Sequence, residues 1–179
     1  MTDVWTHEPA TYVCPFCALV AGSASDVLRA SDIIAETDRA LAFVSPRWWE
    51  GNEGHVLVIP RAHHENLYNT PVEDLAAVFA LVQRVARAIR STYECTGTSV
   101  RQHNEPHGNQ DVWHFHAHVF PRHDNDRLYE RAPIDGFADP DRRAAFASRL
   151  RPLLAARGHA AAQAVHDLKA SSDIRATAP

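Results

Sequence analysis

Residues 112–123 read VWHFHAHVFPRH, and this stretch decides the fold. Every second position is a histidine: His114, His116 and His118. Side chains alternate between faces in a strand, so a strand over 112–122 would place the three imidazoles on one face. The other face would carry the core residues Phe115, Ala117 and Val119. At ~3.3 Å per residue the outer two histidines would lie roughly 13 Å apart, which favours separate roles over a single three-histidine metal site.

Two other interpretations of this histidine face have to be weighed. A solvated strand face is more often built from Lys, Glu or Thr than from histidine. A two-histidine metal site in a β-barrel of the cupin kind needs a further histidine and a carboxylate, and such a barrel lacks a long central helix. The sequence upstream predicts a helix of that kind. We therefore interpret the histidine face as a functional one.

The long helix is predicted from Thr70 to about Tyr93. Thr70 can cap it, Pro71 suits the first helical position, and Glu73 completes a capping box. Apolar residues then recur at helical spacing along the segment. A second helix is predicted over 139–158, where apolar and charged residues alternate in a similar way.

The remaining segments up to the histidines alternate between strands and loops. In chain order they are two strands within 31–45 around a turn at 37–39, a loop over 46–54, a buried strand over 55–60, a strand over 98–104 and a loop over 105–111. This order predicts an α+β fold, with an antiparallel β-sheet on which the long helix and a C-terminal helix pack.

The chain has 179 residues, a formal net charge of −4 and 45% hydrophobic residues, which is typical of one globular domain. We expect an N-terminal arm over 1–13, the domain over 14–157, and an Ala-rich, poorly ordered tail over 158–179. Because there is no basic block, neither nucleic acid nor an anionic membrane is an expected partner. No apolar run approaches the ~20 residues of a spanning helix, and no secretory signal is visible, so we expect a cytoplasmic protein.

The segment H-F-H-A-H-V-F resembles the motif of the histidine triad (HIT) family. The segments G-H-V-L-V-I-P-R-A-H and N-E-P-H-G-N-Q-D-V-W also resemble that family, so the likeness covers about residues 12–123. It implies a HIT-like antiparallel fold, a homodimer, and a nucleotide hydrolase or transferase that binds a small-molecule nucleotide. Transferase branches end the triad in Gln, whereas this chain has His118, which resembles the hydrolase branches.

The resemblance also implies a role for each histidine of the site. His116 would attack the α-phosphate of a nucleoside phosphate conjugate and form a covalent nucleotidyl-histidine, which water or another acceptor releases. Neutral imidazole suits this role because its pKa is close to ~6.5. The carbonyl of His114 would fix the tautomer of the nucleophile. His118 would contact the phosphate or the leaving oxygen, and His55 would flank the phosphate from the neighbouring strand.

Neutral donors and aromatic rings complete the candidate nucleotide site. Asn104 and Gln110 would hold phosphoryl oxygens without a metal. Trp48 and Trp49 either stack on a base or fill the core or a subunit interface. These alternatives stay open at the level of the sequence.

The chain departs from the family pattern at the ribose site. Relatives carry an Asp just after the strand that here reads A-L-A-F-V-S-P, which has no acid. Asp111 would bring negative charge close to the phosphate, unless it points away or pairs with Arg101. Nucleoside phosphoramidates, dinucleoside polyphosphates and nucleotidyl-sugar-like compounds are the candidate substrates. The alternatives to a hydrolase are a nucleotidyltransferase with a specialised acceptor and a non-catalytic nucleotide-binding or scaffold protein.

Cys14 and Cys17 form C-P-F-C, the spacing of half a zinc site, of a redox pair, or of two small buried side chains. The odd count of three cysteines argues against a disulfide framework. HIT proteins with an N-terminal C-x-x-C use positions that match His63 and His114, so the resemblance implies a closed Cys₂His₂ structural zinc site and no catalytic metal. His64 is a rival of His63, although the spacing after the preceding strand favours His63.

Overall fold

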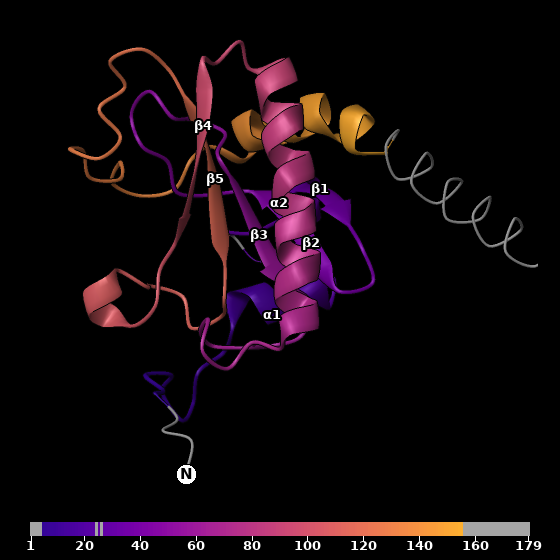
Figure 1. The fold of residues 1–179 in the computed structure, drawn as a ribbon, viewed down its shortest axis with the longest axis vertical. Coiled ribbons are helices and arrows are strands. Elements are labelled where there is room, and N and C mark those ends of the chain that lie inside the picture. Colours follow the sequence, from indigo (N-terminus) through magenta and orange to yellow (C-terminus); the bar gives the residue numbers. More distant parts are fainter. Residues whose placement is uncertain (1–4, 24, 26, 156–179) are drawn as a thin grey trace, which may run out of the picture.

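A computed structural model describes residues 5–23, 25 and 27–155. Its centre is an antiparallel sheet in the order β1-β2-β3-β5-β4, which confirms the predicted α+β class (Figure 1). The strands are β1 Ile33–Glu36, β2 Ala40–Val44, β3 Val56–Pro60, β4 Gly97–Gln102 and β5 Ala117–Arg122. Among the described residues, no helix is long and apolar enough to cross a membrane.

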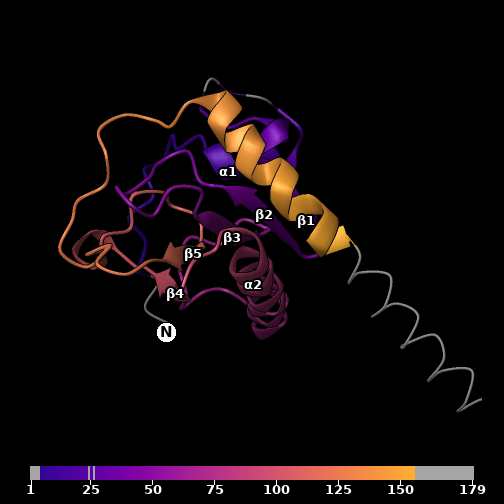
Figure 2. The same ribbon diagram turned by 90° about the horizontal axis from the view of Figure 1, so that it is seen from above.

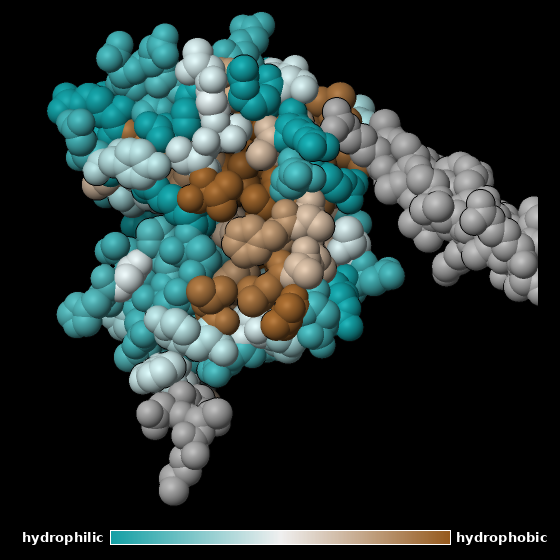
Figure 3. All heavy atoms as spheres, viewed as in Figure 1, coloured by the Kyte–Doolittle hydropathy of each residue, from teal (hydrophilic) through white to brown (hydrophobic). Residues whose placement is uncertain are grey.

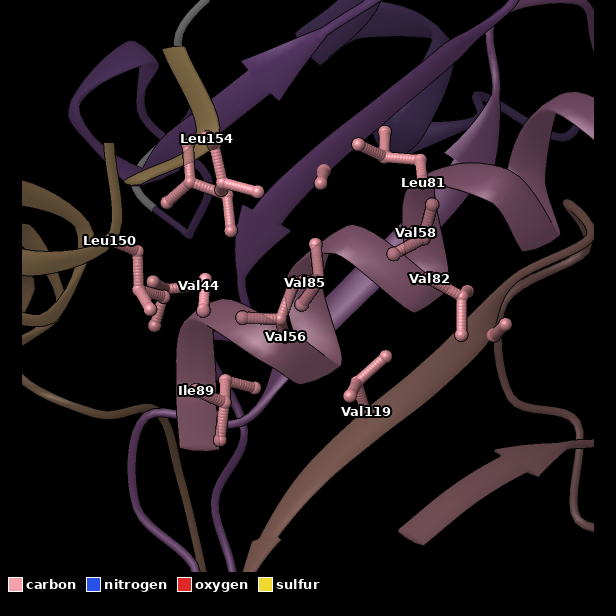
Figure 4. Packing of buried hydrophobic residues seen from close by; sticks show 14 of the residues in the cluster. Val44, Val56, Val58, Leu81, Val82, Val85, Ile89, Val119, Leu150 and Leu154 are labelled. Carbon is pink, nitrogen blue, oxygen red and sulfur yellow. The ribbon is translucent and has the colours of Figure 1, made fainter. Parts of the chain in front are cut away.

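One face of the sheet packs against two helices. These are α2, Val72–Thr92, and a C-terminal helix over residues 140–155, which confirms the predicted pair (Figure 2). Figure 4 shows the core between them, with Val85 and Ile89 of α2 facing Val56 of β3, and Leu150 of the C-terminal helix beside β2. Small and β-branched residues at alternate strand positions let the helices approach the sheet closely.

The other face of the sheet carries α1, Pro15–Val20, on the side opposite α2 (Figure 2). Intervening strand residues form a second apolar cluster there, made of Leu41, Phe43, Leu57 and Ile59 with the α1 residues Phe16 and Leu19. This second cluster covers β2 and β3, and the same face of β5 carries His118. A helix thus begins within C-P-F-C, because Cys14 accepts a hydrogen bond from the Cys17 N–H as N-cap and Pro15 follows it.

The start of α2 differs from its prediction. Pro71 is the N-cap and has no side chain that can accept a hydrogen bond, so the predicted capping box is wrong. The hydroxyl of Thr70 instead donates to the Asn66 carbonyl at 2.7 Å. Glu73 and Asp74 still lie in the first turn, where negative charge stabilises a helix. The predicted end holds, since Tyr93 is the C-cap.

The histidine strand is shorter than predicted and begins at Ala117. The backbone before it bonds elsewhere: the His114 N–H donates to the Val112 carbonyl at 2.8 Å, and the Phe115 N–H donates to the His64 carbonyl at 2.6 Å. His114 therefore precedes the strand, and only the third triad histidine lies within it. The core prediction for the intervening residues is confirmed, because Phe115 is buried in the α2 core.

Two contacts fix the C-terminal helix to the rest of the fold. Arg143 and Asp32 form an ion pair of 3.0 Å whose side chains are 1% and 0% exposed. Gly54 lies against Phe146, and the Tyr93 hydroxyl donates to the Gly54 carbonyl at 3.2 Å. These contacts set the end of the loop over 46–54, from which β3 begins.

Segments at both ends of the chain complete the description. Residues 5–13 contain no helix or strand and contact the loop after β3: the Asn66 amide donates to the Trp5 carbonyl at 2.7 Å, and the His7 N–H donates to Glu65 at 2.6 Å. The predicted tail over 158–179 lies outside the described residues.

Candidate active site and zinc site

His116 is held as a single tautomer just before β5. Its Nδ1 lies 2.7 Å from the His114 carbonyl, which can only accept, so Nδ1 carries the proton and Nε2 keeps a free lone pair. The side chain is 2% exposed, and burial lowers the pKa of His116 from its usual value. The ring is therefore neutral at pH 7, which is the nucleophilic form of imidazole.

His118 and His55 form an uncharged pair beside the ring of His116. Pairing of β3 with β5 sets Leu57 opposite His118, and the His118 Nδ1 lies 3.4 Å from the His55 Nε2. The ring of His118 is 5.0 Å from that of His116, centre to centre. Burial and, to a lesser degree, Arg101 lower the pKa of His55 to about 3, and burial with the neighbouring histidines holds the pKa of His118 well below its usual value. The structure thus brings all three predicted catalytic histidines together.

The two adjacent tryptophans point to different environments. Trp48 is 3% exposed, lies in the α2 core against Phe146, and donates to the Ser45 carbonyl at 2.7 Å. Base stacking is therefore excluded for Trp48 in this structure, and its core-filling alternative holds. Trp49 instead meets the His55 ring edge-on at 5.5 Å and lines the cavities described next.

Two cavities meet at the triad. The first, the apolar cavity, has a volume of about 520 Å³ and is lined by His116, His118, Trp49 and mainly apolar residues that include Phe16, Leu57 and Phe137. The second, the arginine cavity, has a volume of about 440 Å³ and is lined by Arg47, Arg101, Arg131, His103, His118, Trp49 and others. Both cavities share His118, Trp49, Arg47 and Asp111 as walls. The histidine face therefore borders both a mainly apolar space and a cationic space.

The amide groups of Asn104 and Gln110, predicted to bind phosphate, make hydrogen bonds within the protein. Gln110 lines the arginine cavity, but its amide nitrogen donates to the carbonyls of Glu65 and Val112, at 2.6 and 3.0 Å. The Asn104 oxygen accepts from the Leu67 N–H at 2.8 Å, and Asn104 is not among the lining residues of either cavity. In this conformation both amides hold loops in place, so their contact with phosphoryl oxygens stays a prediction.

Charged residues surround the triad, and the sequence reasoning did not place Arg47, Arg101 or Arg131 there. Asp111 pairs with Arg47 at 3.2 Å, not with Arg101 as weighed from the sequence. Pairing of β4 with β5 sets Arg101 opposite His118, so a correct strand register could have found it. Arg131 comes from a segment without periodicity, which carried no signal. His103 bonds the Gly108 carbonyl at 2.6 Å and also meets the His118 ring at 5.5 Å.

The four predicted zinc ligands lie in one cluster at the start of α1. One donor atom from each of Cys14, Cys17, His63 and His114 lies within 4.8 Å of the others. The Sγ of Cys17 is 3.2 Å from the His63 Nδ1, and the Sγ of Cys14 is 3.4 Å from the His114 Nδ1. In a tetrahedron with the usual Zn–S and Zn–N bond lengths, sulfur and nitrogen are separated by roughly 3.6 Å. The donor set and its spacing therefore fit zinc.

Outer hydrogen bonds orient both imidazoles toward this cluster. The Nε2 of His63 lies 2.7 Å from a Glu8 carboxylate oxygen, and the Nε2 of His114 lies 3.0 Å from the Pro60 carbonyl. Such partners hold the second nitrogen of a metal-ligating histidine and fix which nitrogen faces the metal. The rival His64 pairs instead with Asp74 at 2.9 Å, outside the cluster.

Comparison with known proteins identifies the family. Residues 29–125 match the HIT domain. The uncharacterized HIT-like protein Rv1262c of Mycobacterium tuberculosis is 36% identical over 131 residues, which cover 73% of this chain and 86% of that one. The chain therefore belongs to the HIT family.

Two further relatives carry descriptive names. The crystal structure of a Zn-bound histidine triad family protein from Mycobacterium smegmatis matches with a TM-score of 0.65 and 34% identity, covering 82% of this chain and 96% of that chain. The adenosine 5'-monophosphoramidase HNT1 of Saccharomyces cerevisiae is 31% identical over 127 residues, which cover 69% of this chain and 73% of that one. The zinc-bound relative agrees with the donor cluster of this chain.

Proposed function

We propose that this protein hydrolyses nucleoside phosphate conjugates at the α-phosphate, through a covalent nucleotidyl-histidine on His116. The observation that carries the proposal is the 2.7 Å contact between the Nδ1 of His116 and the His114 carbonyl, which leaves Nε2 as the nucleophilic atom at a cavity wall. The relative HNT1 is named an adenosine 5'-monophosphoramidase, which supports cleavage of a bond at the α-phosphate.

The chemistry is a double displacement. The His116 Nε2 forms a bond to the α-phosphorus while the bond from phosphorus to the leaving group breaks, and the leaving atom keeps the electron pair. The imidazolium produced is stabilised because its Nδ1–H already points at the His114 carbonyl. Water then attacks the same phosphorus, the N–P bond breaks, and its electron pair returns to Nε2. The products are a nucleoside monophosphate, the leaving group and one proton.

The apolar cavity takes the nucleoside. A volume of about 520 Å³ is ample for a purine nucleoside, and Trp49 and Phe137 offer ring faces in its wall. Asp111 also lines this cavity, and its pairing with Arg47 offsets its negative charge near the phosphate. Of the two alternatives that the sequence left open, we assign base stacking to Trp49, whereas Trp48 lies in the core.

Cys14, Cys17, His63 and His114 would hold zinc in a closed structural site with no position for substrate. A metal held there would tie the start of α1 to the segment that carries the nucleophile. Because His114 offers its Nδ1 to the cluster and its carbonyl to His116, this one residue links the donor cluster to the nucleophile's tautomer. The reaction itself needs no metal in this scheme.

A homodimer is the proposed assembly. Figure 3 shows apolar side chains gathered over α2 and the neighbouring edge of the sheet. Val72 and Phe79 of α2 and Val100 of β4 are 78%, 44% and 45% exposed, although large apolar side chains are usually buried. Light scattering after gel filtration tests this assembly, and a monomer at micromolar concentration would refute it. A cytoplasmic location remains an expectation from the sequence.

The test of the activity uses a fluorogenic adenosine phosphoramidate. Wild-type protein should release the fluorescent amine, and His116→Ala should lower kcat/KM by more than about 10³-fold. His107→Ala is the matched control, because His107 is an exposed histidine of the preceding loop and is not among the lining residues of either cavity. Quenched wild-type protein should also carry one nucleotidyl group by intact mass, which His116→Ala lacks. Normal turnover in His116→Ala would refute the proposal.

A transferase is distinguished by product analysis. With candidate sugar phosphates or alcohols present, a transferase would release nucleotidylated acceptor in place of nucleoside monophosphate. Unchanged monophosphate yield across the acceptors supports the hydrolase. A folded wild-type protein that turns over no conjugate would favour the non-catalytic alternative.

A further inference from the structure

The arginine cavity has no role in binding the nucleoside. It shares His118, Trp49, Arg47 and Asp111 with the apolar cavity, and Arg101 and Arg131 line this cavity alone. These arginines come from three separate parts of the chain: the loop before β3, the strand β4, and the segment after β5. A cationic space next to the reacting centre needs an explanation of its own.

The guanidinium groups have few ionic partners in the cavity. Asp111 is the carboxylate among the lining residues and pairs with Arg47, so three positive groups face one negative group. Arg131 reaches the carboxylate and the carbonyl of Glu50, at 3.1 and 3.2 Å, but Glu50 is not among the lining residues and its side chain is 75% exposed. An exposed pair of this kind is weak and can be exchanged for a stronger anion.

Arg101 is the arginine closest to the triad. It lies over the Phe120 ring at 5.1 Å, and that ring stacks on His118 at 5.5 Å and on His55 at 4.3 Å. One Nη donates to the Leu128 carbonyl at 3.1 Å, while Nε is buried with no partner among the described residues. The pairing of β4 with β5 fixes this arginine opposite His118.

His118 in the wall of this cavity and the adjoining His55 do not supply positive charge. The pKa of His55 lies at about 3 and that of His118 well below its usual value, both mainly because the rings are buried. The arginines of the cavity stay ionised at any working pH. Guanidinium groups bind phosphate and other oxyanions in preference to neutral groups.

We propose that the arginine cavity binds the leaving group of the substrate, and that this leaving group is a phosphate or polyphosphate. This inference rests on the proposed hydrolase function and makes phosphoric anhydrides the preferred substrate class over phosphoramidates. The nucleoside lies in the apolar cavity, the α-phosphate lies at His116 and His118 on the shared wall, and the distal phosphates extend toward Arg101 and Arg131.

The bond chemistry agrees with this assignment. In an anhydride, the bond between the α-phosphorus and the bridging oxygen breaks, and that oxygen leaves with the electron pair as part of a phosphate anion. Phosphate is stable as an anion near pH 7, so no proton donor is needed at that step. An amine leaves as a neutral or cationic group, so the guanidinium groups have no anion to bind in that case. Arginines that stabilise the anion lower the barrier for the anhydride alone.

The experiment compares two substrates with one nucleoside, a dinucleoside tetraphosphate and a phosphoramidate of a neutral amine. Arg101→Gln and Arg131→Gln should each lower kcat/KM for the tetraphosphate about 10- to 100-fold, the loss expected for one charged hydrogen bond. The same variants should change kcat/KM for the phosphoramidate less than about threefold. Arg127→Gln is the matched control, because Arg127 lies in the same segment as Arg131 and pairs with Glu130 outside the cavity.

A binding measurement separates this inference from the proposed activity. Inorganic tripolyphosphate should bind wild type, His116→Ala and Arg127→Gln with similar affinity in calorimetry, and about tenfold or more weakly in Arg101→Gln and Arg131→Gln. No binding to wild type, or equal binding to all variants, would overturn the leaving-group site even if the enzyme is active. Equal losses on both substrates would overturn the selectivity for anhydrides. Tripolyphosphate binding without turnover of either substrate would overturn the hydrolase and retain the anion site.

Discussion

Gly54, the residue before His55, should not tolerate even a methyl group. It has a φ of +74°, and a Cβ built there would lie 2.4 Å from the Cδ1 of Phe146 and 2.7 Å from its Cε1 and Cγ. The Phe146 ring cannot simply turn away, because it packs against Trp48 at 5.4 Å and Tyr93 at 5.1 Å. The contact therefore joins the start of β3 to the C-terminal helix.

The cost of Gly54→Ala has two parts. The left-handed backbone costs an L-residue about 1–2 kcal/mol. Forcing a methyl group into a packed core costs about 1–3 kcal/mol more. We expect the free energy of unfolding to fall by ~2–5 kcal/mol, a large share of the stability of an ordinary domain. We also expect kcat/KM to fall, because His55 follows directly.

Gly136→Ala isolates the backbone part of this cost. Gly136 has a φ of +79°, and nothing among the described residues lies within 4 Å of its Cβ position. This control should lose only about 1–2 kcal/mol. In a Phe146→Ala background, Gly54→Ala should also cost no more than the control, because the colliding ring is gone.

Urea denaturation followed by circular dichroism, with zinc present throughout, measures all of these variants. If Gly54→Ala and Gly136→Ala lose the same stability, the steric argument is wrong and Phe146 does not hold this loop. An undiminished cost in the Phe146→Ala background would lead to the same conclusion.

Three further predictions follow from features described above. Metal analysis should find about one zinc per chain. Cys14→Ser should lose most of the zinc and several degrees of Tm, whereas the control Cys95→Ser should keep the metal. A stable, metal-free wild type would contradict the zinc site. Arg143→Ala should lower the free energy of unfolding in urea by about 3–5 kcal/mol, because it leaves the buried Asp32 carboxylate unpaired. The control Arg61→Ala, which breaks the exposed pair with Glu36, should lower it by at most about 1 kcal/mol. Burial lowers the pKa of His55 to about 3 in the folded protein, so between about pH 3 and 6.5 the unfolded chain binds more protons than the folded one. The free energy of unfolding should therefore fall as the pH drops from about 6.5 toward 3, by up to about 1.4 kcal/mol per pH unit for this group. If His55→Gln leaves the pH dependence of the free energy of unfolding unchanged, the ring is not buried and neutral.

The sequence was sufficient for most of the fold because its patterns are local. Alternating apolar residues predicted the paired strands β1 and β2, and helical spacing predicted α2 and the C-terminal helix. The errors occur where tertiary hydrogen bonds override local preference. Thr70 bonds the Asn66 carbonyl instead of capping α2, and the Phe115 N–H bonds the His64 carbonyl instead of extending β5.

The candidate site was predictable only where residue type limits function. Histidines at alternate positions have few other uses, and the C-x-x-C spacing indicates half a zinc site, whereas His63 and His114 were named as its other ligands because of the resemblance to the HIT family. Tryptophan and arginine serve many roles, and only the packing separates buried Trp48 from Trp49 at the cavity wall. Arg131 reaches the triad from an irregular segment, whose course depends on long-range contacts that no local pattern encodes.

The shared wall between the two cavities has a consequence for inhibitor design. Two small fragments, one apolar and one anionic, can be selected separately because each cavity has its own chemistry. Joined by a short linker that crosses Trp49 and His118, the second fragment would bind at an effective concentration in the millimolar range, without any new contact. A linked compound of this kind would gain affinity only in proteins that have both spaces side by side.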